Sequence, residues 1–387
     1  MQLAYLTSLY DRPGPWASVY LDTSRMDESA RWRMELQARN ACDDLAAQGA
    51  DEATVQAVHE ALASWPRPPG EAGRAVFASH GQVVLDPSLS VRPSAPTQVY
   101  WSSLPRVGPL LDLAAREPVC LVAYIDRTGA DLELRSAIGE MRLRTVTGRE
   151  WPIHRTSQNT WSVRHWQLGV ENTWEQNAAE VADAIAECVA DTGADLVVLA
   201  GDPRERRSVF DRLPGECRSV TVETEHGGRG AGASRVRLDE DVQEARRRLL
   251  RHNEEAELDR FRSVRAPEGG KAAGAAAAEG LPALVEAARE HRIMELLIRS
   301  EGPDAHRQVW VGAEPDQVAV RRSESQYLGD TEPVPARADD ALLRAAVSAG
   351  AEVLRVRPEL EDDLPVGGLG ALLRWPYSEK ETEAATM

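Results

Sequence analysis

Several residue patterns that mark common protein classes are scarce in this sequence. It has four cysteines, and no two of them are separated by only two residues. Because zinc sites and disulfide scaffolds need such spacing or many more cysteines, we expect buried free thiols instead. No apolar run approaches the roughly 18 residues of a membrane helix. The amino terminus has no basic segment followed by an apolar stretch, so we expect a cytoplasmic protein with no membrane partner.

Familiar catalytic signatures are also missing. There is no Gly-x-Ser-x-Gly elbow, no His-Glu-x-x-His pair and no Walker phosphate loop. The 62 acidic residues are so numerous that neighbouring carboxylates carry little information. We interpret Asp43 with Asp44, and the run 361–363, as surface charge. The sequence therefore predicts neither a metal nor a cofactor.

The length and apolar content are sufficient for several hydrophobic cores. The chain has 387 residues, of which 42% are hydrophobic, so two or three α/β domains of ordinary size are expected. The net charge of −17 argues against a general nucleic-acid binder, because phosphate contact relies on basic surface. Any basic patch must therefore be local.

The pattern of the first part predicts an α/β domain over residues 1–116. Successive prolines at 66, 68 and 69 end its second helix, because proline removes a backbone donor and clashes with the preceding turn. The expected elements are a strand at 16–21, helices at about 27–48 and 51–64, and strands at 74–79 and 82–85.

The sequence pattern of the middle part, residues 117–266, predicts a mixed sheet with helices. A hairpin is expected from 118–125 and 131–135 around the turn at 126–129. A long irregular stretch follows, and then a helix whose apolar face is formed at spacings of 4, 3, 4 and 3 by Trp174, Ala178, Val181, Ile185 and Cys188. The remaining expected elements are a buried strand at 195–201, a helix at 204–213, a strand at 218–223 and a long charged helix at about 237–263.

A glycine-rich loop at 225–232 precedes that charged helix. Its glycines are compatible with a phosphate loop, but the Gly-x-Gly-x-x-Gly fingerprint and the Gly-Lys-Ser/Thr ending are absent, which favours a surface connection. On the helix, the run Arg246-Arg247-Arg248 lies among the glutamates Glu244, Glu254, Glu255 and Glu257. Such mixed charge is typical of a solvated face, with contact to RNA as the alternative.

The last part, residues 267–387, predicts a third α/β domain after a low-complexity hinge at 268–274. The expected elements are a helix at 275–291, strands at 293–298, 308–312 and 317–320, a helix at 339–349, a strand at 352–356, and a closing segment at 367–375.

Two segments of this third domain carry a family resemblance. Gly280–Arg289 followed by Ile293–Ile298, and the closing Gly367–Trp375, resemble the carboxy-terminal domain of class-1 release factors and Pelota. The whole chain is similar to the bacterial archaeo-eukaryotic release factor families, including actinobacterial relatives of the ribosome hibernation factor Balon. The resemblance implies three domains: an amino-terminal α/β domain, a ribonuclease-H-like central domain and a Pelota-type carboxy-terminal domain.

The family's hydrolytic tripeptide, Gly-Gly-Gln, occurs nowhere in this chain. The corresponding region, 151–171, has only Gln158 and Gln167, and neither adjoins a glycine. Residues 141–170 carry five arginines and one glutamate, so they form a local basic and aromatic island. Arginine pairs with phosphate and tryptophan stacks on unpaired bases, which makes the island a candidate for contact with ribosomal RNA. The candidate RNA-binding residues are Arg142, Arg144, Arg149, Trp151, His154, Arg155, Trp161, Arg164, His165 and Trp166.

Three interpretations remain open. The resemblance implies a monomeric translation factor that occupies the ribosomal A site near the peptidyl-transferase centre, as a hibernation or stress factor, with elongation factor Tu as a potential partner. An enzymatic alternative is a peptidyl-tRNA hydrolase similar to the Vms-type members, with Gln167 positioning water. The structural alternative is that the island's tryptophans fill the core of an ordered loop while its arginines face solvent.

Overall fold

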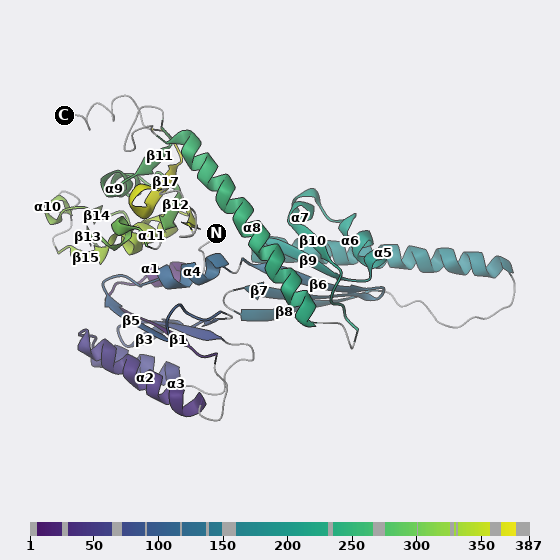
Figure 1. Ribbon diagram of the computed structural model, residues 1–387, viewed down its shortest axis with the longest axis horizontal. Coiled ribbons are helices and arrows are strands. Elements are labelled where there is room, and N and C mark those ends of the chain that lie inside the picture. The colour runs from purple at the N-terminus through teal and green to yellow at the C-terminus, as the bar shows by residue number, and fades with distance from the viewer. Residues whose placement is uncertain are drawn as a thin grey trace. The chain divides into compact units, whose positions relative to one another are not determined.

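The computed structural model describes most of the chain (Figure 1). The described residues are 6–24, 30–63, 72–89, 91–116, 118–136, 139–148, 160–230, 235–265, 275–299, 301–325, 329, 332–356 and 365–376. The chain divides into two compact units: a split unit, residues 1–115 with 252–387, and a central unit, residues 116–251. The division into three domains at 116 and 266 stays a prediction.

The amino-terminal part of the split unit is a five-stranded antiparallel sheet between helices (Figure 1). Successive side chains of a strand point to opposite faces. Val19 therefore packs toward α2 and α3, whereas Tyr20 packs toward α1 and α4. The strands are β1 (Trp16–Asp22), β2 (Gly73–Ser79), β3 (Gln82–Leu85), β4 (Ser88–Leu89) and β5 (Thr97–Ser102). The helices are α1 (Thr7–Tyr10), α2 (Ala30–Ala47), α3 (Glu52–Ala63) and α4 (Gly108–Arg116).

The carboxy-terminal part of the split unit has two sheets. The larger has the order β11-β17-β12-β16, and the smaller has the order β14-β13-β15. Their strands are β11 (Ala277–Glu279), β12 (Ile293–Arg299), β13 (Gln308–Val311), β14 (Val318–Ala319), β15 (Val334–Arg337), β16 (Glu352–Val356) and β17 (Leu369–Leu373). The helical segments are α9 (Leu281–Arg289), η2 (Pro303–His306), α10 (Arg322–Ser325), α11 (Ala338–Ser348) and η4 (Val366–Gly368).

The predicted helix at 275–291 is wrong in its first turns. Ala277–Glu279 instead pair with β17 as an edge strand, and α9 begins only at Leu281. Gly280 separates the two elements with a φ of 80°, a conformation that a residue with a Cβ rarely adopts. Pro282 in the first turn of α9 also suits a helix start, where its missing N–H costs no hydrogen bond.

The two parts of the split unit share one hydrophobic core. Leu110 and Leu111 of α4 belong to the same buried cluster as Leu342 of α11. A buried ion cluster accompanies this core, in which Arg106 Nη1 lies 2.8 Å from a carboxylate oxygen of Asp339 and 2.8 Å from one of Asp340. The segments before residue 116 and after residue 251 therefore fold against each other.

The central unit is a five-stranded mixed sheet with the order β10-β9-β6-β7-β8. β10, β9 and β6 are mutually parallel, and β6, β7 and β8 are antiparallel. Helices α5 and α6 cover one face, and the first part of α8 covers the other. The strands are β6 (Cys120–Asp126), β7 (Gly129–Ser136), β8 (Gly139–Thr147), β9 (Leu196–Gly201) and β10 (Thr221–Thr224). The helices are α5 (Thr160–Thr192), α6 (Pro203–Phe210), α7 (Gly215–Ser219) and α8 (Arg235–Val264).

These observations confirm the expected α/β class, the hairpin after residue 118 and the buried strand before residue 202. The expectation of buried free thiols is also confirmed, because the four cysteines are free and buried. The predicted hinge at 268–274 lies outside the described residues. No helix within the described part of the chain is both long and apolar enough to cross a membrane.

Candidate functional site

The irregular stretch predicted before Trp174 is wrong from Thr160 onward. α5 begins there and continues without interruption to Thr192. Residues 160–173 contain no proline and a single glycine, Gly169, and their arginine, leucine, glutamine and glutamate residues favour a helix. One helical glycine costs only about 1 kcal/mol, which the remainder of a long helix can offset.

The helix changes the geometry of the basic and aromatic island. Four of its residues, Arg149, Trp151, His154 and Arg155, lie outside the described part of the chain, as does Gln158. Four others, Trp161, Arg164, His165 and Trp166, lie in the first turns of α5 together with Gln167, and only the backbone is described there. At 3.6 residues per turn, spacings of 3 and 4 place Trp161, Arg164 and His165 on one side of the helix.

The last two island residues, Arg142 and Arg144, lie on β8 at the edge of the sheet. The Arg144 Nη1 atom lies 2.5 Å from Oε2 of Glu187 on α5, and at least half of each side chain is exposed. Exposed ion pairs contribute about 0–1 kcal/mol, so an RNA phosphate could replace this partner at little cost. The proposed role of the island in binding RNA stays a prediction.

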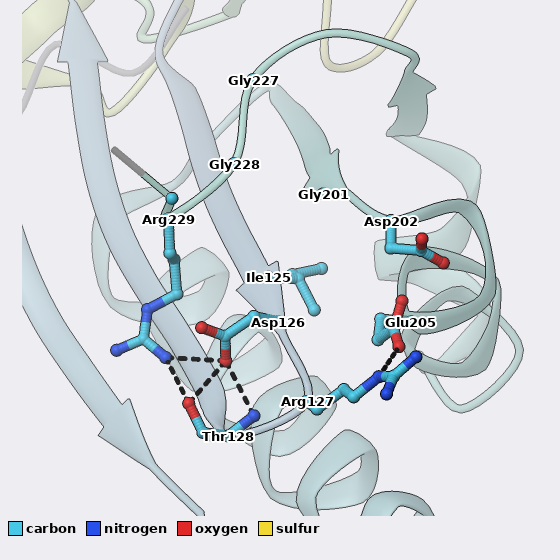
Figure 2. A pocket seen from close by; sticks show the side chains of 11 residues that line it. Ile125, Asp126, Arg127, Thr128, Gly201, Asp202, Glu205, Gly227, Gly228 and Arg229 are labelled. Carbon is cyan, nitrogen blue, oxygen red and sulfur yellow. Dashed lines mark hydrogen bonds and ion pairs between the residues drawn. The ribbon is translucent and has the colours of Figure 1, made fainter. Parts of the chain in front are cut away.

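A cleft that was not identified from the sequence opens in the central unit at the carboxyl ends of the parallel strands β6, β9 and β10 (Figure 2). Loops leave parallel strands in diverging directions at this edge, which is where α/β sheets usually bind ligands. The cleft has a volume of about 520 Å³. A second cavity of about 220 Å³ shares Ile125, Asp126, Arg127 and Glu205 with it and extends to Trp174 on α5.

Glycines allow the three loops of the cleft to approach one another closely. Gly201, at the end of β9, has a φ of 147°, and a Cβ there would lie 2.2 Å from the carbonyl oxygen of Ile125. Gly227, after β10, has a φ of 86°, and a Cβ there would lie 2.8 Å from Leu238. Any side chain at either position would therefore strain the backbone and displace its neighbour.

One wall of the cleft is an ion cluster around Arg229, which belongs to the glycine-rich loop (Figure 2). Its Nη1 donates to Asp126 Oδ1 at 2.9 Å and to Thr128 Oγ1 at 3.1 Å, and its Nε donates to Asp131 at 3.1 Å. Burial acts to raise the pKa of Asp126, but hydrogen bonds from Thr128 and Arg229 outweigh it and lower that pKa. The arginine thus holds the loop against the sheet.

The opposite wall begins with the first turn of α6. Asp202 caps this helix by accepting a hydrogen bond of 3.0 Å from the Arg204 N–H. The neighbouring Glu205 carboxyl group is the largest influence on the pKa of Asp202 and lowers it, and the hydrogen bond from the Arg204 N–H lowers it further. Figure 2 shows the Asp202 and Glu205 side chains on the same side of the cleft, away from Arg229. Two carboxyl groups are therefore presented together.

A planar cation lies between this acidic wall and α5. The Arg127 guanidinium stacks over the Trp174 ring at 4.5 Å, and its Nε donates to Glu205 Oε1 at 2.9 Å. The Arg127 carbonyl accepts a hydrogen bond of 2.9 Å from Asn177. Backbone and side chain of Arg127 are thus fixed from three directions, although 57% of its side chain remains exposed.

A histidine that the sequence did not single out lies just before the glycines of the loop. His226 Nδ1 is 2.8 Å from Asp241 Oδ2, and the Thr224 hydroxyl donates to the same oxygen. The hydrogen bonds from Thr224 and then from His226 lower the pKa of Asp241. A carboxylate on Nδ1 holds the proton there and leaves Nε2 as the acceptor of the neutral ring.

The cleft has no arrangement suited to a metal ion. Among the described residues, no three His, Cys, Asp or Glu side chains gather closely enough to hold one. Arg229 also already supplies the positive charge next to Asp126 and Asp131. The described geometry therefore offers carboxylates, fixed guanidinium groups and an aromatic ring as its binding groups.

Known proteins resemble this chain in part or over nearly its full length. The uncharacterized protein Rv2629 of Mycobacterium tuberculosis is 29% identical over 369 residues, which cover 95% of each chain. The archaeal translation termination factor aRF1 is 15% identical, with 96% of each chain covered and a TM-score of 0.25. Saccharomyces cerevisiae Dom34, described as a translation termination-like factor in RNA quality control, is 10% identical, with 79% of this chain and 82% of that chain covered and a TM-score of 0.41.

A family match addresses the central unit directly. Residues 119–267 match Bacterial archaeo-eukaryotic release factor family 2. The matched segment begins one residue before β6 and ends three residues after α8, so it includes the whole sheet with its cleft. The resemblance expected from the sequence is thereby confirmed: this chain is similar to the bacterial archaeo-eukaryotic release factors, and family 2 among them matches its central unit.

Proposed function

We propose that this protein is a ribosome-binding translation factor that occupies the A site as a hibernation or stress factor and releases no peptide. The observation that carries the proposal is the combination of a release-factor family match over residues 119–267 with the complete absence of Gly-Gly-Gln from the chain. Its partner is ribosomal RNA at the A site and the peptidyl-transferase centre, with elongation factor Tu as a second partner. It acts as a cytoplasmic monomer.

The island at 141–170 supports an RNA-binding role. Its five arginines oppose a single glutamate in a chain whose net charge is −17. Along the backbone of the helix that begins at Thr160, Trp161, Arg164 and His165 occupy positions about one turn apart, so an aromatic residue lies close to a cationic one in the helix. This spacing suits a short stretch of RNA with unpaired bases.

Co-sedimentation with ribosomes from stationary-phase cells tests this proposal. Replacing Trp161 and Arg164 together by Ala should weaken binding about tenfold or more, because one stacked base contributes about 1–3 kcal/mol. A matched control removes one exposed arginine and one exposed tryptophan elsewhere, by Arg307→Ala with Trp375→Ala. Unchanged binding in the island variant, or equal weakening in the control, would argue against the island as the RNA contact.

The enzymatic alternative rests on Gln167, which lies on the α5 backbone seven residues before Trp174. If Gln167 positioned water, ribosomes that carry peptidyl-tRNA would lose their peptide in the presence of the protein. We expect the ester to remain intact with both the unaltered protein and Gln167→Ala. Release that depends on Gln167 would replace the binding function by a hydrolase.

A further inference from the structure

We propose that the cleft at the carboxyl edge of the central sheet binds a ribonucleoside, with its base stacked on Arg127 and its ribose hydroxyls donating to the carboxylates of Asp202 and Glu205. Neither the family match nor the proposed A-site function assigns a ligand to this cleft. The source is either a free nucleoside or an unpaired nucleotide of RNA. If the ligand is an unpaired nucleotide of RNA, the inference rests on the proposed function. If the ligand is a free nucleoside, it does not.

The size and position of the cleft fit a small ligand. The main cleft of about 520 Å³ adjoins the cavity of about 220 Å³, and Arg127 and Glu205 line both. Ligand sites in proteins typically occupy about 300–1,000 Å³. The site also lies at the carboxyl ends of three neighbouring parallel strands, where loops leave room between them.

The Arg127 guanidinium provides a fixed plane for stacking. The Arg127 Cζ lies 4.5 Å from the centre of the Trp174 ring, over that ring, and Glu205 and Asn177 hold the side chain and the carbonyl of Arg127. A single ring covers only one face of the guanidinium, and 57% of the arginine side chain is exposed. Nucleobases stack on arginine planes in this way, and the prior fixation of Arg127 reduces the entropy lost on binding.

The acidic wall selects for hydroxyl donors. Oε2 of Glu205 is buried and has no hydrogen-bond partner among the described residues, and Asp202 lies beside it (Figure 2). A ribose cis-diol supplies two O–H donors, which is the way acidic residues recognise ribose in other α/β folds. The cleft as a whole disfavours a phosphate group, because Arg127 is paired with Glu205 and Arg229 is paired with Asp126 and Asp131. The phosphate of a bound nucleotide therefore stays outside the cleft.

Two conservative variants test the two halves of the site. Arg127→Lys keeps the positive charge but removes the planar guanidinium group on which the base would stack. Asp202→Asn removes one acceptor charge and keeps the helix cap, because asparagine caps a helix as well as aspartate does. The control for Arg127→Lys is Arg207→Lys on α6, because the Arg207 guanidinium lies 5.0 Å from the centre of the Phe210 ring. The control for Asp202→Asn is Asp211→Asn at the carboxyl end of α6. Circular dichroism checks that all four variants are folded.

Binding is measured on the full-length protein without ribosomes, by calorimetry and ligand-observed NMR. The probes are the four ribonucleosides, the 2′-deoxy form of each one that binds, and single-stranded RNA and DNA oligonucleotides of equal sequence. We expect at least one ribonucleoside to bind, its deoxy form to bind about tenfold more weakly, and each cleft variant to lose about tenfold in affinity while the controls do not. Binding of the RNA oligonucleotide alone, in preference to DNA and with the same losses, supports the RNA source.

Two results would overturn the site. One is the absence of binding by every nucleoside and oligonucleotide up to millimolar concentration, and the other is binding that both cleft variants leave unchanged. Failure of the proposed function has a different signature, because it removes co-sedimentation with ribosomes in the unaltered protein and leaves nucleoside binding in place.

Discussion

Two clusters in this molecule have the same chemistry in different surroundings. In the split unit, Arg106 contacts Asp339 and Asp340, whose side chains are 6% and 3% exposed. In the central unit, Arg229 contacts Asp126 and Asp131, whose side chains are 42% and 20% exposed. Each cluster joins one arginine to two aspartates from other segments of the chain. They differ in how much water reaches the charges.

The difference in solvent access separates a structural bond from a binding wall. A charge that is removed from water costs several kcal/mol unless a partner compensates it, so loss of one member of the buried cluster leaves a large penalty. Water screens the charges around Arg229, and the same interaction is therefore weaker. We interpret the Arg106 cluster as a link within the split unit and the Arg229 cluster as part of a site.

The largest expected effect follows from Arg106→Ala. It removes the closer of the two arginines that face the buried Asp340, which should lower the free energy of unfolding by about 3–5 kcal/mol. Chemical denaturation followed by circular dichroism measures the change. Arg337→Ala is the milder comparison, because Arg337 is more exposed and lies 3.8 Å from Asp340. Equal losses in the two variants would contradict a special role for Arg106.

The pH dependence of stability should show the second effect. Burial, and then the neighbouring charge of Asp339, raise the pKa of Asp340 to about 7. The folded state therefore holds a proton that the unfolded state has released, so stability should fall as pH rises from about 4 to 7 and then level off. The pKa of Asp339 is lowered, so protonation of Asp339 changes the stability only below this pH range.

Asp340→Asn isolates that contribution, because asparagine does not titrate. Its unfolding free energy should fall less steeply between pH 4 and 7 than that of the unaltered protein. A residual slope is expected from Glu295, whose pKa burial and a hydrogen bond with Glu257 raise to about 7. Identical slopes in the two proteins would show that Asp340 is ionised throughout this range.

A smaller effect is expected for Arg229→Ala. The partly exposed cluster should contribute about 1 kcal/mol to global stability, so the main change should be local. Amide hydrogen exchange at Gly227 and Gly228 should become faster, because the loop loses its attachment to the sheet. Arg235→Ala, which removes a more exposed arginine paired with Glu133, is the control and should leave the exchange rates of those amides unchanged.

The smallest effect is expected for Glu187→Gln, which removes the partner of Arg144. Both side chains are exposed, so stability should change by less than about 0.5 kcal/mol. Ribosome binding should strengthen slightly at low salt, because one more cation is available for phosphate. Weaker binding would instead indicate that the pair positions Arg144.

The local sequence pattern was sufficient to predict an element whose structure depends mainly on its own residues. The spacing of Ala178, Val181, Ile185 and Cys188 predicted one buried face of a helix, and all four lie in one buried cluster of the central unit. Trp174 continues the same spacing but is 37% exposed and stacks with Arg127 instead. Periodicity states which side of a helix a residue occupies, whereas the extent of the core decides whether that side is covered.

The sequence alone determined the α/β class, most element positions and the absence of Gly-Gly-Gln, because alternation, helical spacing and tripeptides are local properties. Only the tertiary structure joined residues 126–128, 201–205 and 227–230 into one cleft, because parallel strand order brings distant loops to the same edge. The hydrophobic core shared by α4 and α11 likewise joins residues that lie far apart in the sequence. Pairing across more than a hundred residues depends on the packing of whole elements, and no short window of sequence contains that information.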